Sequence, residues 1–167
     1  KCRIKGSSFS LWRWHLDEVF VRINGEQHYL WRAVDQEGEV LESFVTKRRD
    51  RTAALKFLRK AMKRYGRPEV IVTDLLRSYP AAMKMIGIAG RQETGRWKNN
   101  RAENSHQPFR RRERAMAKFR STKSLQKFTS VHASVHNHFN QERHRLSRKN
   151  FKINRSAALA EWRQIAA

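Results

Sequence analysis

Residues 69–74, with the sequence EVIVTD, decide which class of fold this chain adopts. They form a short β-branched run, typical of a strand, and a helical segment precedes them in the chain. A strand that follows a helix in this way is expected to lie parallel to a neighbour in the same sheet. The helix is predicted to begin at the capping residue Asp50 and to end before Gly66 and Pro68. Its apolar residues follow helical spacing: Leu55, Leu58, Met62 and Tyr65.

Three β-favouring runs precede that helix, at residues 16–23, 28–34 and 40–46, and turn signals separate them. They predict an antiparallel meander. In the first run Asp17 shares one face with the apolar residues 19, 21 and 23, while Leu16 and Phe20 occupy the other face. A strand that is covered on both sides is therefore expected, and the fold class changes after residue 69 from β-meander to α/β.

Helices are predicted after the parallel strand at residues 78–86, 101–116, 124–140 and 156–165. The glycines at positions 87, 90 and 95 indicate loop or irregular backbone between the first two. No repeat, low-complexity tract or linker divides the chain. We therefore expect residues 1–167 to form a single domain, with the helices of residues 124–167 packing on its core.

The composition is strongly basic: 167 residues include 37 Lys+Arg and 15 Asp+Glu, for a net charge of +22. A folded domain with this charge is expected to bind a polyanion, and nucleic acid is the commonest one. No run reaches the ~18 uncharged residues of a membrane span, and the single cysteine, Cys2, excludes an internal disulfide framework or a CxxC zinc ribbon. The chain starts without Met shortly before its first strand, from which we expect an N-terminal truncation, and a reducing cytoplasm fits the cysteine content.

Three acidic residues are candidates for catalysis. Asp74 ends the buried strand and Asp17 lies within another, and neighbouring strands, ~4.8 Å apart, would bring both carboxylates to one place. Glu103 lies at the start of the basic helix. Taken singly, Asp17 is explained by an Arg or Lys partner and Glu103 by the helix dipole. Together, carboxylates without a Cys or His ligand set suit Mg²⁺ or Mn²⁺, and a pair of such ions supports phosphoryl transfer.

Other features point to less specific roles. His132 and His136 have the i, i+4 spacing that could bind zinc, but no HExxH motif or cysteine pair accompanies them, so packing, capping or DNA contact is the alternative. There is no Walker A motif, dinucleotide fingerprint or GxSxG elbow. The tryptophans are expected to be mostly core residues, although Trp97 could line a site near Glu103: Trp12, Trp14, Trp31, Trp97 and Trp162.

Six segments spread over nearly the whole chain carry a family resemblance: WHLDE at 14–18, YLWRAVD at 29–35, RD at 49–50, VTD at 72–74, NNRAEN at 99–104 and FRRRERAM at 109–116. With these motifs the chain resembles the catalytic domain of bacterial insertion-sequence transposases with a DDE triad, closest to the insertion sequence six family. The resemblance implies an α/β, ribonuclease-H-like (retroviral-integrase-like) fold, a mixed sheet flanked by helices. It also implies a triad of Asp17, Asp74 and Glu103 that binds two Mg²⁺ (or Mn²⁺) ions.

The resemblance further implies that Arg110, seven residues after Glu103, approaches DNA near the scissile phosphate. A solvated arginine in a basic run is the alternative explanation. The surrounding basic stretch suits phosphate contacts: Arg110, Arg111, Arg112, Arg114, Lys118, Arg120 and Lys123. Two features depart from the family pattern: the 29-residue interval from Asp74 to Glu103 is short, and Leu75 stands where Lys is usual. The family's helix-turn-helix segment would precede residue 1, and we expect sequence recognition to lie there.

The function that these observations imply is metal-dependent cleavage of the 3′ end of an insertion sequence and transfer of that end to target DNA. Expected partners are the element ends and the target DNA, with no membrane, and the expected assembly is a homodimer or higher oligomer. The expected location is the bacterial cytoplasm, at the nucleoid. Two alternatives stay open: a catalytically decayed, basic DNA-binding remnant, and a ribonuclease-H-like nuclease that cuts without joining.

Overall fold

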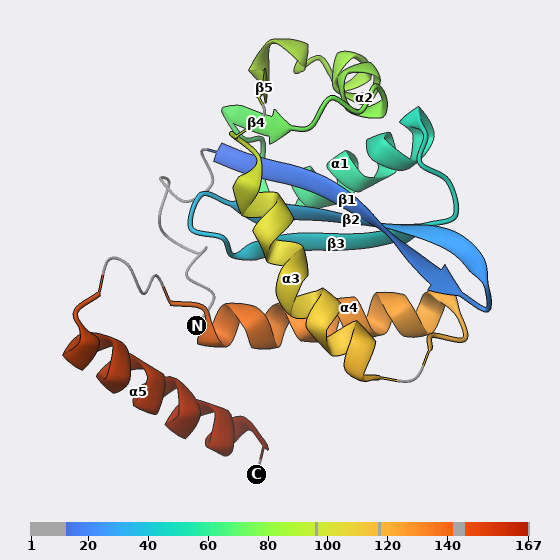
Figure 1. Cartoon of the computed structure of the whole chain (residues 1–167). Coiled ribbons are helices and arrows are strands. Elements are labelled where there is room, and N and C mark those ends of the chain that lie inside the picture. Colours follow the sequence, from blue (N-terminus) through green and yellow to red (C-terminus); the bar gives the residue numbers. More distant parts are fainter. Residues whose placement is uncertain (1–12, 96, 117, 142–145, 167) are drawn as a thin grey trace.

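A five-stranded mixed sheet forms the centre of the molecule (Figure 1). The computed structural model describes residues 13–95, 97–116, 118–141 and 146–166, so Cys2 and Trp12 lie outside the described part. The strand order is β3-β2-β1-β4-β5. The strands are β1 (Arg13–Ile23), β2 (Glu26–Asp35), β3 (Val40–Thr46), β4 (Val70–Thr73) and β5 (Gln92–Thr94). The helices are α1 (Arg51–Tyr65), α2 (Ser78–Ile86), α3 (Asn100–Ala115), α4 (Thr122–Phe139) and α5 (Arg148–Ala166), with a 3₁₀ turn at Ala89–Arg91.

The predicted meander and the predicted parallel strand are both confirmed. β1 pairs antiparallel with β2, and β2 with β3. The β1–β2 hairpin turns at Asn24 and Gly25, both with positive φ, which is the conformation that a tight two-residue hairpin requires. β4 enters from α1 and pairs parallel with β1. The long strand β1 therefore lies between an antiparallel and a parallel neighbour, which makes the sheet mixed.

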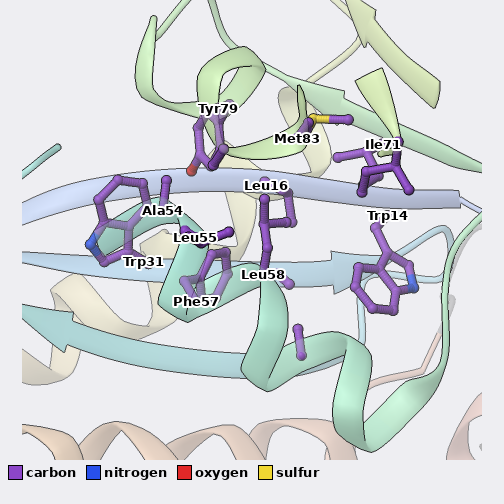
Figure 2. Close-up of a cluster of buried hydrophobic side chains, with 14 of the residues drawn as sticks. Trp14, Leu16, Trp31, Ala54, Leu55, Phe57, Leu58, Ile71, Tyr79 and Met83 are labelled. Carbon is purple, nitrogen blue, oxygen red and sulfur yellow. The ribbon is translucent and has the colours of Figure 1, made fainter. Parts of the chain in front are cut away.

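Helices cover both faces of this sheet. α1 and α2 cover one face, where Trp14, Leu16 and Trp31 pack against side chains of these helices (Figure 2). On the other face, Val21 and Leu30 pack with Phe109 of α3 and with α4. Burial on both sides explains why strands β1 and β2 carry apolar residues at odd and even positions alike.

Helix α4 also protects the outer edge of the sheet. The Gln126 side-chain amide accepts from the Val45 N–H at 2.9 Å and donates to the Ser43 carbonyl at 2.8 Å. Asn137 forms the same two kinds of bond with the N–H and the carbonyl of Val40, at 2.8 and 2.9 Å. These amides satisfy backbone groups of the edge strand β3 that would otherwise be open to another strand.

Capping residues mark both ends of α1 and the start of α4. Asp50 accepts from the Ala53 N–H at 2.8 Å and begins α1, while Gly66, at φ 81°, ends it. Ser121 accepts from the Ser124 N–H at 3.1 Å and begins α4.

Three details differ from expectation. β5 lies in the stretch expected to be irregular, because it is a three-residue strand of polar residues without a hydrophobic pattern. α5 begins eight residues earlier than predicted, where Ser147 accepts from the Asn150 N–H at 3.2 Å. Trp14 and Trp31 are fully buried, as expected, but Trp97 is 74% exposed and Trp162 36% exposed, so these two are not core residues.

α5 lies beside α4, away from the sheet (Figure 1). His138 of α4 is 2.7 Å from the Ala158 carbonyl, and the Trp162 ring packs against Phe139 with 5.8 Å between centroids. Among the described residues, no helix is both long enough and apolar enough to cross a membrane.

Candidate functional site

Asp17 and Asp74 come together where β1 and β4 separate. The last paired residues of these strands are His15 and Val72. Each aspartate lies two positions farther along the chain, Asp17 within β1 and Asp74 just after the end of β4. Ligand oxygens of Asp17, Asp74 and Glu18 all lie within 4.8 Å of one another. The expectation that neighbouring strands bring the two aspartates to one place is therefore confirmed, and Glu18 joins them.

Glu18 is the acidic side chain that sequence reasoning missed. Its side chain is 2% exposed, accepts a hydrogen bond from the Tyr79 hydroxyl at 3.0 Å and lies 3.2 Å from the Arg49 guanidinium. Burial and the nearby Asp74 carboxylate raise the pKa of Glu18 to about 8. Adjacent residues of a strand normally point to opposite faces, so strand alternation does not group Glu18 with Asp17.

The negative charge of the Asp74 carboxylate is only partly stabilised by neighbouring groups. Burial raises its pKa above the ordinary value, and the Asp17 charge adds to the effect. The Leu76 N–H donates to Asp74 Oδ1 at 3.1 Å, which opposes that shift. Three acidic groups thus share a space in which negative charge is unfavourable, and a bound cation would relieve that repulsion.

Asp17 faces α3 and contacts a buried histidine there. His106 Nε2 lies 3.3 Å from Asp17 Oδ2, and His106 is 3% exposed. Burial lowers the pKa of His106, although the contact with Asp17 acts in the opposite direction. The imidazole is therefore favoured in its neutral form, in which a single ring N–H is available to donate to the carboxylate.

Two further contacts fix α3 beside Asp17. The Asn99 side chain donates to the Leu16 carbonyl at 2.8 Å, just before the start of the helix. Arg32, opposite Asp17 in the β1–β2 register and 1% exposed, donates to the Ser105 carbonyl. The alternative explanation for Asp17 was an Arg or Lys partner. The side chain that contacts Asp17 is His106, and Arg32 binds the helix instead.

Glu103 lies in the first turn of α3 and is exposed. It is not one of the three acidic residues whose oxygens lie within 4.8 Å of one another. It precedes His106 by three residues and so lies on a neighbouring part of the same helix face. The helix that carries Glu103 is thus held directly against Asp17, and Glu103 is its only acidic first-turn residue.

Arg110 differs from the other basic residues of its stretch. Its guanidinium lies 2.6 Å from Glu113 Oε2, donates to the Phe20 carbonyl at 2.6 Å and stands over the Phe20 ring. These contacts hold it between α3 and β1. The remaining six are exposed, along the end of α3, the connection and the first turn of α4: Arg111, Arg112, Arg114, Lys118, Arg120 and Lys123.

His132 and His136 pack rather than form a metal centre. Their rings are stacked 6.4 Å apart, and His132 also contacts the rings of Phe109 and Phe128. Burial lowers the pKa of both. Within the described residues, the only group of three potential metal ligands is the acidic one, so the zinc alternative has no third ligand.

The donor set at the β1–β4 end fits a hard divalent cation. All three groups offer carboxylate oxygens, the ligands that Mg²⁺ and Mn²⁺ prefer, and none is a thiolate or imidazole. The raised pKa values of Glu18 and Asp74 have the same origin, since negative charge there lacks a sufficient counter-charge. The residues present therefore fit the metal that the family resemblance implies.

Comparison with known proteins supports the resemblance. A family described as a DDE domain matches residues 11–142. Transposases of the insertion sequence-like element IS431mec from Staphylococcus aureus strain Mu50 and of the element IS257 in transposon Tn4003 from Staphylococcus aureus are each 32% identical over 100 residues. These residues are 57% of this chain and 45% of each relative. The chain thus spans about half the length of the curated relatives that it matches.

Solved structures confirm the predicted fold. The magnesium-bound catalytic core domain of HTLV-2 integrase, in a dimeric form, is similar over 61% of this chain and 69% of that one, with a TM-score of 0.52 and 15% identity. At this identity the likeness establishes the fold alone. It agrees with the mixed sheet flanked by helices that the motifs led us to expect.

Proposed function

Because the chain belongs to the DDE domain family of insertion-sequence transposases, we propose that it is the catalytic domain of a DNA transposase. In this proposal it cleaves the 3′ end of its element and transfers that end to target DNA. The observation that carries the proposal is the meeting of Asp17 and Asp74 at the diverging ends of β1 and β4. We treat residues 1–167 as one catalytic domain.

Asp17, Asp74 and Glu103 are proposed as the metal-binding triad, for two Mg²⁺ or Mn²⁺ ions. Bound ions would activate the attacking oxygen and stabilise the leaving oxygen of the phosphodiester. Asp17 and Asp74 supply charge from rigid strands, and the contact with His106 orients the Asp17 carboxylate. Glu103 would enter from α3. Its support is the docking of that helix through Asn99 and His106.

The exposed basic residues of the α3–α4 connection are proposed to bind DNA phosphates. Helices rise 1.5 Å per residue, so Arg111 lies about 12 Å along α3 from Glu103, which is a suitable separation for contacts to the flanking duplex. Arg110 contacts Glu113 and Phe20, and we propose that it positions the strand nearest the site by holding α3 against β1. Two DNA ends must be joined to one target, so we propose a homodimer or higher oligomer, acting in the bacterial cytoplasm at the nucleoid.

The proposal is tested by cleavage and strand transfer of labelled element-end DNA with Mg²⁺, comparing Asp74→Asn and Glu103→Gln with the control Glu69→Gln. Glu69 is exposed and precedes the other end of β4. We expect both triad variants to lose cleavage by a factor of 10³ or more while binding DNA normally, and the control to stay active.

Three other outcomes are informative. Cleavage that persists in both triad variants contradicts the metal-site assignment. Cutting without joining supports the nuclease alternative, and salt-dependent DNA binding without any cutting by the unmodified protein supports the decayed remnant.

A further inference from the structure

Two large apolar side chains are exposed beside the acidic group. Leu75, immediately after Asp74, is 85% exposed, and Trp97, in the connection from β5 to α3, is 74% exposed. Single exposed apolar side chains are common on protein surfaces, so it is the position of these two next to the acidic residues, and not exposure alone, that distinguishes them. Trp14 and Trp31, by contrast, are fully buried in the core, so exposure is not a general property of tryptophan in this chain.

The backbone places Trp97 close to the carboxylates. Thr94, the last residue of β5, pairs with Thr73, the residue before Asp74. At the other end of the connection, Asn99 donates to the carbonyl of Leu16, the residue before Asp17. Trp97 is two residues from Asn99 and three from Thr94, and consecutive Cα atoms are 3.8 Å apart, so its backbone stays within about 12 Å of both anchors.

Neither side chain contributes much to the core. Leu76, not Leu75, is the residue of that turn that packs against the main core cluster, and its N–H accounts for the hydrogen bond to Asp74. The surroundings of Trp97 are charged: Lys98 lies 3.2 Å from Glu93, which also pairs with Arg13 at 3.2 Å. A flat, apolar ring among these charged groups suits a ligand with both an apolar face and a phosphate.

We propose that Trp97 is a stacking platform for an unpaired nucleobase at the end of the DNA strand held by the acidic group, with Leu75 completing the apolar surface. A nucleobase would offer an aromatic face to the ring, while its phosphate would lie toward the carboxylates, which would hold the metal ions. Stacking of this kind tolerates any base, so it adds affinity for a frayed or single-stranded end without reading sequence. The inference rests on the proposed function and adds to it a preference for unpaired ends.

The test uses the full chain, with catalytically inactive Asp74→Asn as background, and two labelled probes: a short blunt duplex and the same duplex with a single-stranded 3′ overhang. Trp97→Ala is compared with Trp97→Phe and with the control Trp162→Phe, which changes a partly exposed tryptophan on α5. Dissociation constants are measured at several salt concentrations. Quenching of tryptophan fluorescence by the overhang probe is measured in parallel.

We expect Trp97→Ala to weaken binding of the overhang probe about tenfold and binding of the blunt duplex less than twofold. Trp97→Phe should keep most of the affinity. The salt dependence should not change, because no charge is removed. Fluorescence quenching should disappear in Trp97→Phe and persist in Trp162→Phe.

Equal effects on both probes, or no effect on either, would overturn the stacking site while leaving the proposed function intact. If the unmodified protein bound neither probe, the proposed function would fail, and this inference with it. Leu75→Ser provides an independent check. This variant should also lower the affinity for the overhang probe relative to the blunt duplex, by a smaller factor than Trp97→Ala. An unchanged melting temperature in each variant would show that the effect is on binding.

Discussion

The two faces of the sheet are built differently. On the face covered by α1 and α2, Trp14, Leu16 and Trp31 pack among apolar side chains (Figure 2). On the face covered by α3 and α4, buried polar groups interrupt the apolar cluster: Arg32, His106 and, partly, His132. Both faces are filled. The first buries the hydrogen bond from Tyr79 to Glu18 beside the acidic group, whereas the second places buried polar groups within its apolar cluster, at a cost in desolvation.

This difference separates stability from function. The apolar cluster of the α1–α2 face depends on shape and apolar area, so its residues that do not contact Glu18 are expected to affect mainly the free energy of unfolding. The α3–α4 face holds the helix that carries Glu103 against Asp17 through polar contacts of defined direction. Substitutions there should alter the site more than the stability.

The largest effect on stability is expected from Trp31→Ala on the apolar face. Trp31 is fully buried and packs against Phe57 and Tyr79, with ring centroids 6.0 and 5.5 Å away. The substitution should lower the free energy of unfolding by about 3–5 kcal/mol, because it removes apolar area and leaves a cavity. Urea denaturation measures this change. A loss below about 1 kcal/mol would mean that the surrounding side chains collapse into the gap. Close apolar packing would then not distinguish the stability of this face from that of the other.

The sequence predicted the apolar face better than the polar one. The β-favouring runs of the strands and the spacing of residues 55, 58 and 62 follow from burial, so the meander, α1 and β4 were all predictable. β5 was not, because a short strand of Gln92, Glu93 and Thr94 depends on pairing with β4 rather than on its own pattern. Propensity carries no information about such pairing.

The site was predictable in part for the same reason. Asp17 and Asp74 come together if their strands are neighbours. The sequence predicted that the second strand has a parallel neighbour, and the structure shows that this neighbour is β1. Glu18 and His106 could not be predicted in this way. Glu18 joins the acidic group where β1 separates from β4, and His106 reaches Asp17 because α3 docks there. Those are tertiary events without a local signal. Trp97 was expected mostly in the core because tryptophan usually is buried, and its exposure became evident only with the fold.

Glu18 provides the next largest effect, through pH. The folded protein holds the Glu18 proton up to about pH 8, whereas an ordinary glutamate releases it near 4.5. Between these values the unfolded chain loses a proton that the folded chain keeps, so rising pH favours unfolding. We expect the stability that Glu18 contributes to fall by an amount on the order of 2 kcal/mol across this window.

Denaturation of the unmodified protein and of Glu18→Gln from about pH 5 to about pH 8 isolates this contribution. As pH rises, the free energy of unfolding of Glu18→Gln should increase relative to that of the unmodified protein. A parallel dependence in both would assign the slope to other groups, such as Asp35, whose pKa burial raises to about 6.

A smaller effect, confined to the site, is expected from His106→Asn. The amide can still donate a hydrogen bond but is too short to hold Asp17 in the same position, so affinity for Mn²⁺ should fall about 10–100-fold. His132→Asn is the control, since His132 lies on the same face, partly buried, and packs against Phe109 and Phe128. Calorimetric titration with Mn²⁺ measures both. Equal losses in the two variants would show that His106 acts through packing alone, and the polar face would then resemble the apolar one.

The smallest effect should distinguish two adjacent arginines of α3. Arg111 is exposed, so Arg111→Ala should leave stability within about 0.5 kcal/mol and lower the slope of log K against log salt for DNA binding by about 0.9. Arg110→Ala should do the reverse, because its guanidinium is engaged by Glu113 and the Phe20 carbonyl: stability falls by about 1 kcal/mol and the slope hardly changes. If Arg110→Ala lowered the slope as much as Arg111→Ala, Arg110 would have to exchange its protein contacts for a phosphate when DNA binds. Arg110, which bridges α3 and β1, would then belong to the packed face in the free protein and to the DNA-binding residues in the complex.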